Sequence, residues 1–125
     1  MADVLVADDQ EDVLVLLRTI LELEGHGVAL ASDGCQLVEK AVAAAPDVII
    51  LDVMMPNLDG VSALRMLRQH ASTADVPVIV LSGKGDPGAI DAGFAAGANS
   101  YLVKPFDPDE LVAEINRACP NIGAA

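Results

Sequence analysis

The sequence predicts an α/β fold in which a doubly wound parallel sheet of five strands carries helices on both faces. Three short apolar segments, rich in β-branched residues, are each followed directly by charged residues. Residues 4–7 precede Asp8 and Asp9, residues 48–51 precede Asp52, and residues 101–103 precede Lys104. Runs too apolar to face water on either side are typical of buried parallel strands. Strand-like and helix-like segments also alternate five times, which favours a parallel sheet between two helical layers.

Length and composition fit one domain. A chain of 125 residues is too short for a second core, and its 53% of hydrophobic residues supplies one core without disulfides or a structural metal. We expect this domain over residues 1–119, followed by a short tail or the start of a linker at residues 120–125.

The charge balance restricts the partners. The chain has 7 basic and 19 acidic residues, a formal net charge of −12, so its surface repels nucleic acid and anionic lipid and favours cations or a basic protein face. We therefore expect no direct binding of nucleic acid by this chain and no membrane association. A strand-like start at residue 3 leaves no space for a secretory signal, and no apolar stretch approaches the roughly 20 residues of a membrane helix. These features predict a soluble, cytoplasmic protein.

The first half of the chain contains three strands and two helices. The first helix follows Asp9, ends at Gly25, and is expected to bury one apolar face made of Val13, Leu14, Leu16, Leu17, Ile20 and Leu21. Residues 28–31 form the second strand. Residues 32–34 then open a second helix, which Pro46 stops because proline cannot continue it, and the third strand follows at once.

The second half adds two strands and three helices. The third helix follows Gly60, and residues 78–81 form the fourth strand. The next helix is the weakest, since Gly88, Gly93 and Gly97 fall in or beside it and each interior glycine costs about 1 kcal/mol against alanine. The last helix follows the fifth strand and has a complete set of start signals: Asp107 as the cap, Pro108 in the first position and Glu110 in a capping box.

Short right-handed crossovers favour the strand order 2-1-3-4-5, the flavodoxin-like arrangement. Strands 1 and 3 are neighbours in this order, at the point where it reverses, and open α/β sheets bind ligands at that point. We therefore expect Asp8, Asp9 and Asp52 to meet there, with Lys104 on the same edge.

The charged edge predicts phosphoryl chemistry. Clustered carboxylates repel one another unless a cation offsets their charge, and oxygen ligands without His or Cys point to Mg²⁺, which also accepts phosphate oxygens. An oxygen of Asp52 is then placed to attack phosphorus, while Lys104 and Ser82 engage the equatorial oxygens. Taken singly, each residue also fits a helix cap or a surface turn. Taken together, they project from one edge, which caps and turns do not require.

Four segments then stand out together: residues 4–9, residues 50–56 with Asp59 and Gly60, residues 80–83, and residues 97–106. In this order and at these separations, the chain resembles a two-component response-regulator receiver domain of the chemotaxis-regulator kind over essentially its whole length. The resemblance implies phosphorelay signalling rather than an enzyme, in a domain that catalyses its own phosphoryl transfer and slow autodephosphorylation. The implied partners are a sensor histidine kinase or a histidine phosphotransfer protein, and a downstream protein or a fused output domain.

The resemblance implies a role for each residue of the charged edge. Asp52 corresponds to the phosphoacceptor, which takes a phosphoryl group from a phosphohistidine. Asp8, Asp9 and Asp52, with the backbone carbonyl of Met54, correspond to the Mg²⁺ ligands. Lys104 corresponds to the lysine that pairs with the phosphate, and the peptide bond after it is expected to be cis, against about 5–6% of X–Pro bonds in folded proteins.

Two further positions resemble the residues that switch the conformation of the family. Ser82 corresponds to the switch hydroxyl, and Tyr101 corresponds to the switch aromatic residue. Tyr101 lies three residues before Lys104, so on a strand it points to the opposite face, and the weak helix beside it is the kind of element that moves. The alternative is an ordinary half-buried tyrosine. Phosphorylation is expected to change the surface of the fourth helix, fifth strand and fifth helix. Met54 and Lys84 occupy the positions that modulate hydrolysis of the aspartyl phosphate in the family. Because Met54 is apolar, we expect the phosphoryl group on Asp52 to be long-lived.

Other identities stay open from the sequence. The domain is either a stand-alone regulator or a piece of a larger transcription factor or hybrid kinase. A Mg²⁺-dependent aspartate-nucleophile phosphatase is a remote alternative, because such enzymes need an acid where this chain has Met54. A flavin-binding module of the same topology needs a phosphate loop after the first strand, where Asp8 and Asp9 would repel the phosphate.

Overall fold

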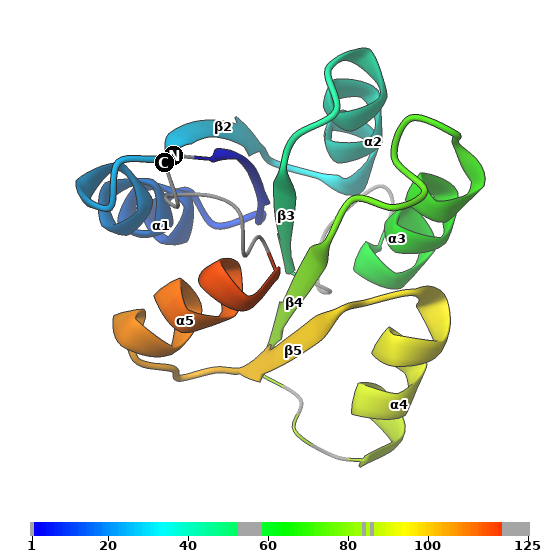
Figure 1. Cartoon of the computed structure of the whole chain (residues 1–125). Coiled ribbons are helices and arrows are strands. Elements are labelled where there is room, and N and C mark those ends of the chain that lie inside the picture. The colour runs from blue at the N-terminus through cyan, green and yellow to red at the C-terminus, as the bar shows by residue number, and fades with distance from the viewer. Residues whose placement is uncertain (1, 53–58, 84, 86, 119–125) are drawn as a thin grey trace.

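A computed structural model describes residues 2–52, 59–83, 85 and 87–118, and these residues show the predicted alternation of strands and helices (Figure 1). The strands are β1 (Asp3–Ala7), β2 (Gly27–Ala31), β3 (Val48–Asp52), β4 (Val78–Ser82) and β5 (Ser100–Val103). The helices are α1 (Glu11–Leu23), α2 (Gly34–Ala43), α3 (Gly60–Gln69), α4 (Pro87–Ala96) and α5 (Pro108–Ala118). Neighbouring strands are parallel in the order β2-β1-β3-β4-β5, which confirms the predicted flavodoxin-like fold.

The sheet separates two apolar cores (Figure 1). On one face, side chains of α2, α3 and α4 pack with strand residues such as Leu51 and Val80. On the other face, α1 and α5 pack with strand residues such as Val6 and Ile50. β3 and β4 are buried along their whole length, because helices cover both sides of the middle of the sheet. Their continuous aliphatic sequences suit that environment.

Two expectations about burial are wrong. The predicted apolar face of α1 includes Leu16, but this side chain is 59% exposed. The buried residues of α1 are Leu14, Leu17 and Leu21, and Leu16 points away from them because two residues turn a helix by about 200°. β5 is not buried on both sides either, since it is an edge strand and its Val103 is 39% exposed.

The ends of the helices agree with the predicted signals. The side chain of Asp33 caps α2 by accepting a hydrogen bond from the backbone N–H of Gln36 at 2.8 Å. At the start of α5, the carboxylate of Glu110 accepts from the backbone N–H of Asp107 at 3.3 Å, one half of a capping box. α1 ends before Gly25, whose φ of 86° is a conformation that favours glycine.

The longest helix in the described part of the chain, α1, has 13 residues. None of the described helices combines the length and the apolar character that crossing a bilayer requires.

Candidate functional site

Three acidic side chains meet at the carboxyl ends of β1 and β3. Ala7, the last residue of β1, pairs with Leu51 of β3, so Asp8 stands beside Asp52. One carboxylate oxygen from each of Asp8, Asp9 and Asp52 lies within 4.8 Å of the other two. The structure therefore brings together the carboxylates that the sequence singles out, at the reversal of strand order where open α/β sheets place their ligands.

Lys104 reaches this cluster from the end of β5. Its ammonium donates a hydrogen bond to Oδ2 of Asp52 at 2.8 Å and lies 3.5 Å from Oδ2 of Asp8. Its backbone N–H donates to the carbonyl of Ser82, the last residue of β4, at 2.7 Å. The peptide bond between Lys104 and Pro105 is cis, as predicted. One cation thus contacts two of the three carboxylates.

Asp8 and Asp9 are adjacent in sequence but differ in burial. Asp9 is exposed, whereas Asp8 is 0% exposed. Oδ1 of Asp8 accepts a hydrogen bond from the backbone N–H of Gln10 at 3.0 Å. Oδ2 of Asp8 is buried and has no hydrogen-bond partner among the described residues. A buried oxygen that accepts no hydrogen bond lowers the stability of the fold. A bound cation or a hydrogen-bond donor would remove this cost.

Burial and neighbouring charges shift the pKa of two groups in the cluster. The pKa of Asp8 is raised from 3.8 to about 6, and burial is the largest cause. The hydrogen bond from the backbone of Gln10 and the charge of Lys104 lower this pKa, whereas Asp52 raises it further. Burial alone would lower the pKa of Lys104, but its hydrogen bond to Asp52 and its attraction by the charges of Asp52 and Asp8 raise that pKa above its ordinary value. Lys104 is therefore charged at neutral pH.

The donor set fits a hard divalent cation. Three carboxylates offer oxygen ligands, and Oδ2 of Asp8, which accepts no hydrogen bond from the described residues, is the kind of atom that a divalent cation would satisfy. Mg²⁺ prefers oxygen ligands of this type. The predicted fourth ligand, the backbone carbonyl of Met54, lies outside the described residues, as does Lys84.

The two predicted switch residues lie on neighbouring strands. Ser82 is fully buried at the end of β4, one residue beyond Leu81, which pairs with Asp52. Tyr101 of β5 is half-buried and packs against the core that α2, α3 and α4 cover. The next residue, Leu102, packs in the other core. β5 therefore alternates between the two faces of the sheet, and Tyr101 lies on the side of α4.

The sequence does not predict that Tyr101 lies against Gly93. The sequence indicates only that Gly93 weakens α4, whereas in the structure Gly93 is buried and a Cβ there would stand 3.0 Å from Cδ2 of Tyr101. The only signal in the sequence is the glycine itself, because the fold decides which side chain it meets.

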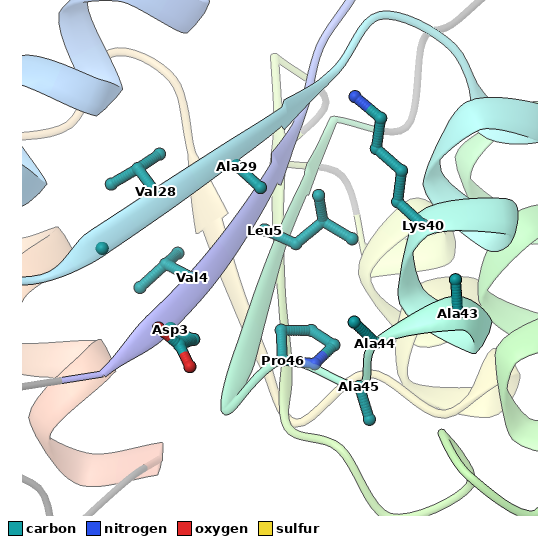
Figure 2. A pocket seen from close by; sticks show the side chains of 11 residues that line it. Asp3, Val4, Leu5, Val28, Ala29, Lys40, Ala43, Ala44, Ala45 and Pro46 are labelled. Carbon is teal, nitrogen blue, oxygen red and sulfur yellow. The ribbon is translucent and has the colours of Figure 1, made fainter.

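A hollow of about 570 Å³ lies away from the acidic cluster, between β1, β2 and the end of α2 (Figure 2). Small and apolar side chains line most of it, together with Lys40, whose ammonium donates a hydrogen bond to the carbonyl of Leu30. It includes Asp3 and Val4 at the start of β1, whereas Asp8 follows the end of that strand. The hollow is therefore separate from the charged site.

Comparisons with known proteins point to one family. A family model described as the response regulator receiver domain matches residues 4–116. The transcriptional regulatory protein PrrA of Mycobacterium leprae is 46% identical over 121 residues, which are 97% of this chain and 51% of that protein. The alkaline phosphatase synthesis transcriptional regulatory protein PhoP of Bacillus subtilis is 39% identical over 90% of this chain and 46% of its own length. The chain thus spans about half the length of these curated relatives.

Solved structures show the same likeness. A putative response regulator from Chloroflexus aurantiacus has a TM-score of 0.91 at 36% identity, covering 95% of this chain and 98% of that one. The receiver domain of the sensor histidine kinase PA1611 from Pseudomonas aeruginosa, which has a magnesium ion coordinated in its active-site cleft, has a TM-score of 0.90 at 32% identity and the same coverage of 95% and 98%. The strand order, the acidic cluster and these likenesses agree: the chain belongs to the response regulator receiver domain family of two-component signalling proteins.

Proposed function

We propose that this domain accepts a phosphoryl group on Asp52 from a phosphohistidine and changes its surface in response. The observation that carries the proposal is the hydrogen bond of 2.8 Å from the ammonium of Lys104 to Oδ2 of Asp52, inside a cluster of three carboxylates. An ammonium held at the attacking group is placed to offset the charge of an incoming phosphoryl group. A cap or a surface turn would need no such pairing.

The transfer forms one bond and breaks one. A carboxylate oxygen of Asp52 bonds to phosphorus while the bond from phosphorus to the donor's imidazole nitrogen breaks, and that nitrogen keeps the electron pair. Lys104 offsets charge on the phosphoryl oxygens, and the buried hydroxyl of Ser82 is the donor proposed for another of them. Mg²⁺, when held by Asp8, Asp9 and Asp52, supplies positive charge that lowers the repulsion between the carboxylate and the phosphoryl group.

The switch is proposed to use Ser82 and Tyr101. Ser82 accepts a hydrogen bond at its carbonyl from the backbone N–H of Lys104, and Tyr101 belongs to the strand that Lys104 follows. A phosphoryl group on Asp52 would attract both the hydroxyl of Ser82 and the ammonium of Lys104. The change then reaches the surface formed by α4, β5 and α5 through Tyr101.

The partners are proposed from the family. The donor is a sensor histidine kinase or a histidine phosphotransfer protein, and the signal passes to a downstream protein or a fused output domain. The matched relatives are named transcriptional regulators and are about twice as long as their matched part, which supports a domain of residues 1–119 inside a longer regulator. Family membership supports a cytoplasmic location, and the net charge of −12 supports the absence of direct nucleic-acid binding by this chain.

A labelling experiment tests the assignment of Asp52. The wild type, Asp52→Asn and the control Asp91→Asn, which changes an exposed residue of α4, are incubated with Mg²⁺ and phosphoramidate, and intact masses are recorded. We expect the wild type and Asp91→Asn to gain one phosphoryl group and Asp52→Asn to gain none. A phosphoryl group on Asp52→Asn, or a wild type that gains none, would show that the proposal is wrong.

A further inference from the structure

β2 forms one edge of the sheet and pairs only with β1 among the described strands. The carbonyl of Ala31 in β2 accepts a hydrogen bond from the backbone N–H of Asp8 at 3.2 Å, so Ala31 turns its backbone groups toward β1. The backbone groups of one residue point to the same side of a strand, and those of the next residue point to the other side. Leu30 and, two residues earlier, Val28 therefore turn their N–H and carbonyl groups away from β1, toward the open edge.

A charged side chain contacts one of these outward groups. The ammonium of Lys40, in the last turn of α2, donates a hydrogen bond to the carbonyl of Leu30, and Figure 2 shows this side chain extending from α2 toward β2. Lys40 is exposed, so its charge keeps contact with water. A lysine at the edge of a sheet is one of the means by which natural proteins prevent another chain from adding a strand.

Small side chains border the same edge. The hollow of about 570 Å³ lies beside it, where Gly27 has no side chain, Ala29 has a small and exposed one, and the end of α2 contributes alanines (Figure 2). Natural proteins also protect an edge by covering it with a helix or a loop. Beside the hollow, the protection comes from the charge of Lys40 instead.

The edge of β2 is complementary to the same edge of a second copy. With a two-fold axis beside Ala29, β2 of the second copy runs antiparallel, and Val28 of each copy lies opposite Leu30 of the other. Residues that face each other in this way exchange both of their N–H to carbonyl hydrogen bonds, and two-fold contacts are the commonest in homo-oligomers. The carbonyl of Leu30 would then accept from Val28 of the second copy, at the position where the ammonium of Lys40 already donates. Burying that ammonium under a second copy would cost further free energy.

We propose that Lys40 keeps the edge of β2 closed to a second copy of this domain. Without the ammonium, the carbonyl of Leu30 is open, and two copies join their sheets through antiparallel pairing of β2. The inference goes beyond the proposed function, since neither Asp52 nor a bound ion takes part in it. It gives a role to a lysine that lies outside the acidic cluster.

Sedimentation equilibrium of the whole chain over a range of concentrations tests the proposal. Lys40→Ala and Lys40→Met both remove the ammonium, and methionine keeps the apolar stem. We expect both variants to dimerise with a dissociation constant at least about tenfold below that of the wild type, because a competing hydrogen bond is removed at each of two carbonyls. Both variants should fold, since Lys40 is exposed and alanine and methionine favour helices; urea midpoints verify this.

Two control variants separate the ammonium from general charge effects. Lys40→Arg keeps a charged donor at the edge, and Arg65→Ala removes one positive charge from an exposed position of α3. Both controls should sediment as the wild type does. Arg65→Ala makes the net charge of −12 more negative by one, as Lys40→Ala does, so general repulsion between copies cannot explain a difference between these two variants.

Hydrogen exchange locates the interface. In a concentrated sample of Lys40→Ala, the backbone N–H groups of Val28 and Leu30 should exchange at least about fivefold more slowly than in a dilute sample, because the second copy binds them. The N–H groups of β5, at the opposite edge of the sheet, should exchange equally fast in both samples.

Three results would overturn the proposal. The first is that Lys40→Ala and Lys40→Met stay monomeric at every concentration. The second is that the wild type or Lys40→Arg dimerises as strongly as these variants do. The third is that the slower exchange in the concentrated sample appears at β5 or elsewhere rather than at β2.

Discussion

Substituting Asp8 by Asn should stabilise the metal-free domain. The carboxylate of Asp8 is 0% exposed, one of its oxygens has no hydrogen-bond partner among the described residues, and its pKa is raised to about 6. Holding this group ionised in the folded state costs about 1.4 kcal/mol for each pKa unit, so the rise from 3.8 to about 6 corresponds to about 3 kcal/mol. Asn removes the charge and keeps an oxygen for the N–H of Gln10. Since its amide must also be buried, we expect a gain of about 1–3 kcal/mol at pH 8.

The pH dependence of this gain follows from the direction of the shift. Between the unfolded value of 3.8 and the folded value of about 6, the folded state of the wild type holds more protons on Asp8 than the unfolded state does. The contribution of Asp8 to stability therefore falls as the pH rises through this window and is fully unfavourable above it. The advantage of Asp8→Asn should be smallest near pH 4, grow up to about pH 6, and stay constant from there to pH 8.

Urea denaturation in EDTA at several pH values measures the free energy of unfolding for wild type, Asp8→Asn and the exposed control Asp91→Asn. Saturating Mg²⁺ should stabilise the wild type by mass action and stabilise Asp8→Asn less, so the difference shrinks or reverses. A variant that is less stable than wild type at pH 8 in EDTA would refute the reasoning. A gain that is the same at pH 4 and pH 8 would show that the buried charge is not its cause.

Two further predictions concern the hydrogen bonds of Arg68 and the lifetime of the phosphoryl group. Arg68→Met keeps an apolar stem but removes the donors to the carbonyls of Gly97, Thr73 and Val76 and to the side chain of Asn99. It should therefore lower the free energy of unfolding by about 2–4 kcal/mol in urea denaturation. A loss below about 0.5 kcal/mol, or an equal loss in the exposed control Arg65→Met, would contradict a stabilising role for these hydrogen bonds. The phosphoryl group on Asp52 should persist for many minutes in Mg²⁺ buffer, because Met54 offers no acid, base or amide to orient a water, and decay within seconds would show otherwise.

The fold is predictable from this sequence because its signals agree with one another. Apolar runs of strand length, helical periods between them and capping residues such as Asp33 all indicate the same alternation. Strand order then places Asp8 beside Asp52 without any knowledge of side-chain contacts. The position of the acidic cluster follows from topology alone.

What the sequence does not predict depends on distances between side chains. Asp8 and Asp9 read alike in the sequence, yet one is fully buried and the other is exposed, because consecutive residues point in different directions. Leu16 reads as core but faces solvent, since a residue belongs to the buried stripe only if its angle matches that of Leu14 and Leu17. The contact of Gly93 with Tyr101 joins two elements whose approach is set by the packing of the whole layer.

The charged edge and Tyr101 are connected through two short strands, β4 and β5. Lys104 contacts Asp52 with its side chain and Ser82 with its backbone N–H, so a new negative charge on Asp52 changes the forces on the residue that follows β5. β5 has four residues, and Tyr101 lies within it, close to Gly93 of α4. β5 is an edge strand and pairs with β4 among the described strands. A charge added at Asp52 would therefore be felt in β5 through Lys104, on the strand where the proposed switch places Tyr101.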